Sequence, residues 1–255
     1  MTRRNDYKNN HYVSAVILGA SLKSKIIIIE NVEGVLRSKQ NVVSTAKLIL
    51  KNAGYNVANS EFMLQADKYN VAQSRKRHFL IAIKSDIYSG FQKYDLLANA
   101  PLCSMDVISD LVNIDSSSLI DTASELSQDN RKRIDYLFQH KIYDLPDKER
   151  PACHRDKKHN YSDVYGRMYP DKPSMTLTTG FQSPGRGRYV HPTQRRGLTP
   201  REGARLQSFP DYFRWKTPLC NVSKQSIARL IGDAVPPNLG EIAALIAIAS
   251  CQKLR

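Results

Sequence analysis

Hydrophobic residues follow a strand–helix–strand pattern over the first third of the chain. Lys25–Glu30 contains four consecutive isoleucines and ends in a carboxylate, a run typical of a strand covered on both faces, as in a parallel sheet. Residues 42–53 carry apolar side chains at helical spacing, and Gly54 is placed to end that helix. Phe79–Ile83 is a second run of strand type. This alternation predicts an α/β domain.

The pattern changes between about Ser85 and Val190. Leu119–Leu126 and Arg131–Phe138 are candidates for short helices, whereas prolines and glycines become frequent beyond Asp144. We therefore expect a separate lobe in this part of the chain.

Helical signals return in the last quarter. Thr199 is a candidate N-cap with Pro200 at the first helical position and Glu202 completing a capping box. Asn238–Glu241 repeats this pattern before an apolar helix, and residues 232–237 (GDAVPP) are expected to form a rigid loop. The predicted organisation is residues 1–84, half of an α/β domain, residues 85–195, a lobe, and residues 196–255, helices that return to the first domain.

Charge is distributed unevenly along the 255 residues, whose formal net charge is +14. Residues 1–84 hold 14 basic and 5 acidic side chains, residues 85–130 hold 1 and 8, and residues 131–205 hold 17 and 8. A basic surface favours a polyanionic partner, although many basic proteins bind none. The acidic stretch is expected to face away from any nucleic acid, and residues 131–205 are expected to face it.

Several classes of protein are excluded by composition. The hydrophobic content of 41% argues against a disordered chain. No apolar run approaches the ~20 residues that span a membrane, so we expect a soluble, cytoplasmic protein without a membrane partner. The four cysteines show no CxxC spacing, so we expect no metal site and no disulfide framework.

The first candidate for chemistry is Glu30, followed by Asn31. A carboxylate just past the carboxyl end of a parallel strand lies where open α/β sheets bind ligands, and partial burial there raises its pKa. The alternative is a strand that simply ends in polar residues.

The second candidate is the segment 73–77, QSRKR. If it is extended, Gln73, Arg75 and Arg77 lie on one side, where they suit a carbonyl oxygen, a phosphate or a carboxylate. The alternative is a solvated basic edge.

The order of four segments identifies a resemblance. ENV at 30–32, QxRxR at 73–77, RGLTPREGARLQSFP at 196–210 and GDAVPP at 232–237 resemble the second half of the motif series of DNA cytosine-5 methyltransferases. Order and spacing agree from about Asp6 to the C-terminus. The resemblance implies half of a Rossmann-like methyltransferase domain with an inserted target-recognition lobe.

The resemblance also implies roles. Glu30 would bind a flipped cytosine and assist at N3, Asn31 would hold the loop, and Arg77 with Arg75 would bind O2 and the neighbouring backbone. S-adenosylmethionine would be the cofactor, shared with a missing N-terminal part. The residues expected at the methionine end of that cofactor are Asp233 and Ala234.

The recognition region of this family lies between QxRxR and LTPRE, and it would contact double-stranded DNA. Small residues there let the backbone approach DNA, and arginines can fork onto guanine or phosphate. The residues expected to contact DNA are Thr176, Leu177, Thr178, Gly180, Arg186 and Arg188.

Two elements of the family pattern are missing. No cysteine follows a proline, so the Pro-Cys nucleophile is absent, and so is the Gly-rich loop. Asp233 stands where the family usually has Asn. Three explanations fit: a subunit completed by a polypeptide with Pro-Cys and the Gly-rich loop, a fragment of a broken gene, or a non-catalytic DNA-binding remnant. Methylation of RNA cytosine is a further alternative. The expected setting is a prokaryotic or phage-encoded, nucleoid-associated protein.

Overall fold

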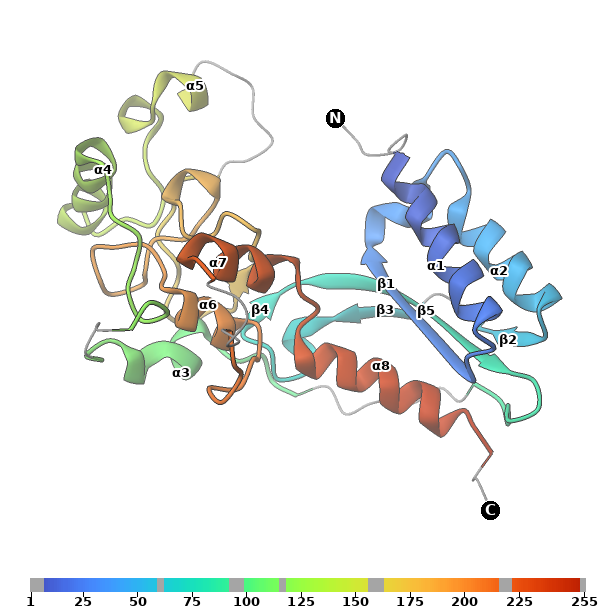
Figure 1. The fold of residues 1–255 in the computed structure, drawn as a ribbon. Coiled ribbons are helices and arrows are strands. Elements are labelled where there is room, and N and C mark those ends of the chain that lie inside the picture. The colour runs from blue at the N-terminus through green and yellow to red at the C-terminus, as the bar shows by residue number, and fades with distance from the viewer. Residues whose placement is uncertain are drawn as a thin grey trace. The chain divides into compact units, whose positions relative to one another are not determined.

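A computed structural model gives the fold (Figure 1) and describes residues 7–58, 62–91, 99–114, 118–155, 163–215 and 222–252. The chain divides into two compact units, each described here by itself. The first unit comprises Met1–Tyr69, Arg75–Ala98 and Asn238–Arg255. The second unit comprises Asn70–Ser74 and Asn99–Pro237.

A four-stranded antiparallel sheet forms the centre of the first unit. The long strand β5 (Lys76–Lys84) pairs with β1 (Ile26–Val32) along one edge. Along its other edge β5 pairs with β2 (Tyr55–Val57) and β3 (Phe62–Gln65). The predicted strands are confirmed, but the expected parallel pairing of the isoleucine run is wrong for the described sheet.

Two helices cover one face of this sheet. Figure 1 shows α1 (Asn10–Ser21) and α2 (Val42–Asn52) side by side, and α2 ends as predicted before Gly54, whose φ of 80° favours glycine. The opposite face carries α8 (Pro237–Ala249). Strand alternation divides the apolar side chains of β5 between the two faces. The core on the α1 and α2 side includes Tyr12, Val16, Ile27, Val43, Ala46, Leu50, Leu80 and Ala82.

The isoleucine run is covered less completely than expected. Ile27 is 7% exposed, whereas Ile28, on the other face, is 38% exposed. Val32 at the end of β1 is 43% exposed. Among the described residues, β1 is an edge strand, because it pairs with β5 along one edge only. No second strand of the described chain lies beside it to shield its side chains from solvent.

The second unit is built from short elements joined by long connections. Its two-residue strands β4 (Gln73–Ser74) and β6 (Ser174–Met175) pair in parallel. The predicted helix at 131–138 is confirmed within α4, but residues 119–126 form a turn followed by irregular chain, so the helix expected there is wrong. The helices are α3 (Ser104–Ile108), α4 (Gln128–Gln139), α5 (Ala152–Arg155), α6 (Pro200–Leu206) and α7 (Lys224–Asp233).

The capping signals gave one correct and one incorrect boundary. Thr199 caps α6 by accepting a hydrogen bond from the Glu202 N–H, and Glu202 returns one to the Thr199 N–H, as predicted. Asn238 is not an N-cap, because α8 already begins at Pro237. A proline is favoured at the first helical position, and α8 begins two residues before the expected start at Leu239. The expected loop at 232–237 is shorter, because Gly232 and Asp233 belong to α7.

One stretch, Lys224–Ala249, is long and apolar enough to cross a membrane by length and composition alone, with a mean hydropathy of 1.2 over its best window. The structure divides it into α7 and α8, which are separated by Ala234–Pro236. About two fifths of that window (39%) is buried within the protein.

Two glycines allow close packing in the second unit. A Cβ on Gly203 would lie 2.3 Å from the Phe181 ring, and one on Gly232 would lie 2.5 Å from the Thr178 backbone. Any larger residue would force these segments apart. The core that they help to close includes Ile108, Leu177, Phe181, Leu198, Leu206, Ile227 and Ile231.

The two compact units do not coincide with the expected organisation. Residues 196–237 belong to the same unit as residues 99–195, whereas they were expected to return to the first domain. Packing alone does not assign a role to a segment, so the target-recognition lobe remains a prediction.

Candidate active site

A partly buried ion pair occupies the sheet of the first unit. Glu30 lies opposite Phe79, and Arg77 lies opposite Val32 two positions away, so Glu30 and Arg77 form a diagonal pair on one face. The Arg77 Nε lies 2.8 Å from the Glu30 Oε1. The two side chains are 13% and 23% exposed, respectively. The carboxylate was expected past the end of a parallel strand, but it lies within β1.

Burial dominates the electrostatics of this pair. It raises the pKa of the Glu30 carboxyl above 4.5, and the charges of Arg77, Arg75 and His78 oppose that rise without reversing it. Burial also lowers the pKa of Arg77, against the effect of Glu30. A carboxyl group with a raised pKa can be protonated closer to neutral pH, which suits it to proton transfer.

The Arg77 guanidinium retains donors for a ligand. One of its five N–H groups points to Glu30, and Nη1 donates to the Lys76 carbonyl oxygen over 2.8 Å. The remaining N–H groups can donate to a carbonyl oxygen while the pair with Glu30 is intact. Carboxyl and guanidinium together therefore match a ring nitrogen beside a carbonyl.

The other predicted residues around this pair are placed differently. Arg75 is only 4% exposed, and its charge acts on Glu30. The Asn31 Oδ1 accepts a hydrogen bond from the Val32 N–H over 2.8 Å, so it fixes the end of the strand. Gln73 belongs to the second unit, where its Oε1 accepts from the Leu177 N–H. The expectation that Gln73, Arg75 and Arg77 share one strand face is wrong, because β4 and β5 are separate strands.

Sequence reasoning missed His78. It is fully buried, stands opposite Asn31 in the register, and its ring centroid lies 6.3 Å from that of Tyr12. Its charge also acts on Glu30. The only signal in the sequence was its position directly after Arg77.

The predicted cofactor residues lie at the end of α7 in the second unit. Asp233 is the last residue of that helix, and its carboxylate is 64% exposed with an Oδ2 3.8 Å from the Arg229 Nε. The Ala234 N–H donates to the Leu230 carbonyl oxygen over 3.0 Å. An exposed carboxylate at this position can accept hydrogen bonds from a cationic ligand.

The six residues predicted to contact DNA divide into exposed and buried ones. Thr178 and Arg186 are exposed, and Gly180 is half-buried. Thr176 is half-buried and its hydroxyl donates to the Ser74 carbonyl oxygen over 2.8 Å. Leu177 is 1% exposed within the core, so a direct contact with DNA by its side chain is corrected to a packing role.

Arg188 is also corrected. It is 7% exposed, and its Nη2 lies 2.5 Å from Asp144 and 2.9 Å from Asp163. Its Nη1 donates to the carbonyl oxygens of Tyr143 and Arg167. With four hydrogen bonds made inside the protein, this guanidinium organises the second unit and is not available to a guanine.

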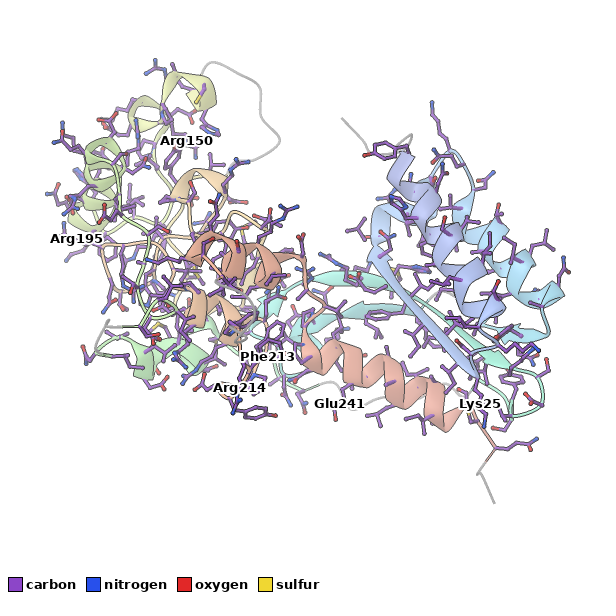
Figure 2. The ribbon with its side chains drawn as sticks, in the orientation of Figure 1. Lys25, Arg150, Arg195, Phe213, Arg214 and Glu241 are labelled. Carbon is purple, nitrogen blue, oxygen red and sulfur yellow. The ribbon has the colours of Figure 1, made fainter. Side chains whose placement is uncertain are left out.

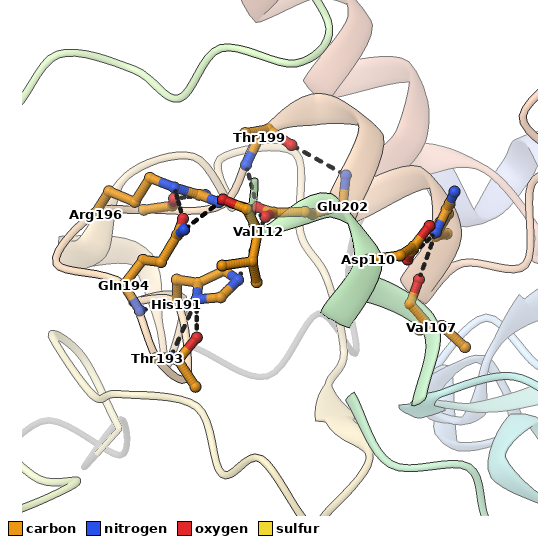
Figure 3. Close-up of polar contacts among 11 residues, drawn as sticks. Val107, Asp110, Val112, His191, Thr193, Gln194, Arg196, Thr199 and Glu202 are labelled. Carbon is orange, nitrogen blue, oxygen red and sulfur yellow. Dashed lines mark hydrogen bonds and ion pairs between the residues drawn. The ribbon is translucent and has the colours of Figure 1, made fainter. Parts of the chain in front are cut away.

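A second glutamate, Glu202, lies within a hydrogen-bonded network of the second unit (Figure 3). Glu202 is fully buried and accepts from both terminal nitrogens of Arg196, over 2.8 and 2.6 Å. It also lies 3.3 Å from the His191 Nε2. The His191 Nδ1 accepts from the N–H groups of Thr193 and Gln194, which turns Nε2 toward the carboxylate.

This network lowers the pKa of Glu202. Burial alone would raise it, but hydrogen bonds from Arg196 and His191 and their charges bring it down to about 2. Every contact of the carboxylate is internal, which makes it a structural group.

Comparison with known proteins identifies the chain. The model of the C-5 cytosine-specific DNA methylase family matches residues 5–246. The chain belongs to this family.

Among the relatives of the chain, the type II methyltransferase M1.BsuMI of Bacillus subtilis is 38% identical over 244 residues. The match covers 96% of the chain but 56% of the relative, so the chain spans little more than half of that protein.

Solved structures share the fold of the chain. The Entamoeba histolytica methyltransferase EhMeth aligns with 96% of the chain and 70% of its own, with a TM-score of 0.59 and 13% identity. The Schizosaccharomyces pombe Dnmt2 methyltransferase aligns with 88% of the chain and 66% of its own, with a TM-score of 0.50 and 21% identity. These likenesses confirm the mixed α/β class.

Proposed function

We propose that this chain is the base-binding and DNA-recognition portion of a DNA cytosine-5 methyltransferase. It would act on a cytosine flipped out of double-stranded DNA, because C5 and C6 cannot be reached within the stack. The observation that carries the proposal is the partly buried Glu30–Arg77 pair, in a chain of the methylase family.

Glu30 acts as the acid at the base. As a thiolate attacks C6 of cytosine and forms a C–S bond, the electron pair of the C5–C6 bond moves through the ring toward N3. The Glu30 carboxyl donates its proton to N3, and burial raises its pKa, which keeps that proton on the carboxyl closer to neutral pH. Arg77 donates hydrogen bonds to O2 through the N–H groups that it does not use within the chain.

S-adenosylmethionine, when bound, would supply the methyl group for C5 and leave as S-adenosylhomocysteine. Loss of the C5 proton to solvent, return of the N3 proton to Glu30 and departure of the thiolate from C6 would then restore the aromatic ring. The exposed Asp233 carboxylate suits the ammonium group at the methionine end, and the Ala234 backbone lies beside it. One carboxylate is only part of a pocket for this cofactor. We assign the remaining contacts to another polypeptide.

A complementing polypeptide would also supply the nucleophile. Of the described cysteines, Cys103 and Cys153 belong to the second unit. Cys251 forms a β-bridge with Tyr88, which follows the end of β5 opposite to Arg77. The seven residue spacings along β5 from Arg77 to Lys84 alone span about 24 Å. The edge of β1, with exposed Ile28 and Val32, is the position we assign to a strand of that polypeptide.

The type II name of the Bacillus relative supports DNA as the substrate and a role in restriction–modification. We place the protein in the cytoplasm of a prokaryote, associated with its DNA. Methylation of RNA cytosine is the rival substrate within the same chemistry.

The test is methyl transfer from labelled S-adenosylmethionine. The chain is assayed alone and after co-expression with the part of the Bacillus relative outside the matched segment, using duplex DNA and transfer RNA as substrates. We expect label in duplex DNA only when both polypeptides are present. Methylation by the purified chain alone would overturn the need for a complement, and label in transfer RNA alone would overturn DNA as the substrate.

A non-catalytic DNA-binding protein is the second candidate. It is favoured by the absence, among the described residues, of any cysteine close to Glu30 along the sheet. Duplex binding without methyl transfer in every complemented mixture would select it.

A further inference from the structure

A hollow of about 470 Å³ lies within the second unit, and neither Glu30 nor Arg77 lines it. Three segments distant in sequence line it: residues 124–130 before and at the start of α4, residues 179–186, and the first two residues of α7. Its volume falls in the range of small-ligand sites. Gln182 and Lys224, which both belong to this lining, had no predicted role.

The chemistry of the lining points to an anion. Arg186 and Lys224 bring two positive charges, against one exposed carboxylate, Glu125. Lys224 and Gln225 begin α7, so the positive end of that helix dipole also faces the hollow. The described lining contains no aromatic residue, and this disfavours a stacked base.

Gly180 sets the position of Arg186. A Cβ at Gly180 would lie 3.1 Å from the Arg186 Cγ and 3.6 Å from its Nε, so the arginine stem lies along the bare glycine backbone. Within the described parts of the chain the Arg186 guanidinium makes no hydrogen bond or ion pair, unlike that of Arg188. Arg186 therefore has its donors free at the rim of the hollow.

Two further groups complete an anion site. The Lys224 Nζ donates to the Ala123 carbonyl oxygen over 3.1 Å, which holds the ammonium in place with two N–H groups remaining. The Gln182 Nε2 is buried from water and has no hydrogen-bond partner among the described residues. A buried amide without a partner is costly, and an oxygen in the hollow would satisfy it.

We propose that this hollow binds a phosphate of the DNA backbone, with Arg186, Lys224 and Gln182 as donors. The inference rests on the proposed function, since it takes the anion to be DNA. Phosphate contacts fix the register of a protein on a duplex without reading its sequence. The hollow would thus anchor the second unit while Thr178, beside it in sequence, approaches the bases.

The test is the salt dependence of binding to a mixed-sequence duplex, measured by fluorescence anisotropy between roughly 50 and 200 mM salt. We expect Lys224→Gln and Arg186→Gln each to weaken binding about tenfold and to lower the log–log salt slope by about 0.9. The matched control is Arg229→Gln, which removes the same charge from a later turn of the same helix, at a residue that does not line the hollow and whose side chain is 77% exposed. It should change the slope by less than half as much.

Ethylation of single phosphates gives a second readout. Ethylation of one particular phosphate should weaken DNA binding by the wild-type chain. Ethylation of the same phosphate should not change DNA binding by the Lys224→Gln variant. Equal slopes for Lys224→Gln and the wild type, or an equal loss in Arg229→Gln, would overturn the anion site and leave the proposed function standing. Failure of the folded wild-type chain to bind any duplex would overturn both.

Discussion

Two glutamate–arginine pairs in this chain consist of the same chemical groups but lie in different environments. Glu30 and Arg77 form one contact of 2.8 Å within a sheet and remain 23% and 13% exposed. Glu202 is fully buried and accepts hydrogen bonds from Arg196 and from the Thr199 N–H. Its carboxylate also lies 3.3 Å from the His191 Nε2. Burial acts on both carboxyl groups, but only Glu202 has enough donors to overcome it.

The consequence is opposite protonation behaviour. The pKa of Glu30 is raised, so its proton is available for transfer, whereas the pKa of Glu202 falls to about 2 and its charge is permanent at neutral pH. A partly satisfied carboxyl group is suited to chemistry, and a fully satisfied one is suited to holding a fold together. The number of donors around a buried carboxylate therefore separates the two roles.

The largest effect is expected from Glu30→Gln on methyl transfer by the complemented enzyme. Gln keeps the size of the side chain but cannot supply the proton, and loss of a general acid costs about 10²- to 10⁴-fold in rate. The matched control is Glu33→Gln, since that carboxylate is 43% exposed with its nearest cation 3.6 Å away. A Glu30→Gln rate within twofold of wild type would remove Glu30 from the mechanism.

Glu202→Ala is expected to cost about 3–5 kcal/mol of unfolding free energy, because it leaves Arg196 and His191 without their buried partner. Urea unfolding measures the loss. Asp135→Ala removes a carboxylate 2.8 Å from Arg195 at an exposed site and should cost at most about 1 kcal/mol. Similar losses in both variants would show that burial of the Glu202 network adds nothing.

The pH dependence of stability should separate the two pairs by sign. The folded pKa of Glu202 is depressed from 4.5 to about 2, so its contribution of about 3 kcal/mol is present above pH 4.5 and is lost as the pH falls toward 2. The folded pKa of Glu30 is raised, so its effect reduces stability as the pH rises above 4.5. Urea unfolding at several pH values measures both effects. Glu202→Gln should remove the rise of the unfolding free energy with pH, and Glu30→Gln should remove the fall. Contributions of the same sign from the two residues would contradict the assignment.

The smallest effect is expected from Glu30→Gln on stability. Its ion pair with Arg77 is single and partly exposed, and the neutral amide avoids the burial penalty of the carboxylate, so the two changes offset each other. Urea unfolding should give a change within about 1 kcal/mol of wild type. A loss as large as that of Glu202→Ala would mean that both pairs are structural.

The sequence predicted the elements with strong local signals. The isoleucine run, the helix ended by Gly54 and the capping box of Thr199 and Glu202 all appear where periodicity and capping placed them. Strand direction was not predictable, because an apolar run has the same pattern in a parallel and in an antiparallel sheet. A helix was predicted at 119–126, where the structure has none, because apolar spacing over eight residues does not establish a helix.

The candidate site was predicted by residue type but not by environment. Glu30 and Arg77 are brought together by the β1–β5 register, which joins segments more than forty residues apart. Arg186 and Arg188 look equivalent in sequence, yet Arg188 is enclosed by Asp144 and Asp163 from distant segments. Only the folded chain determines which arginine is free to bind a ligand.

The contrast between the two glutamates can be measured by NMR titration of the chain with ¹³C-labelled glutamate carboxyl groups. Glu30→Gln and Glu202→Gln spectra assign the two signals. We expect a Glu30 pKa above 4.5 and a Glu202 pKa of about 2. A Glu30 carboxyl that titrates at or below 4.5 would contradict this expectation.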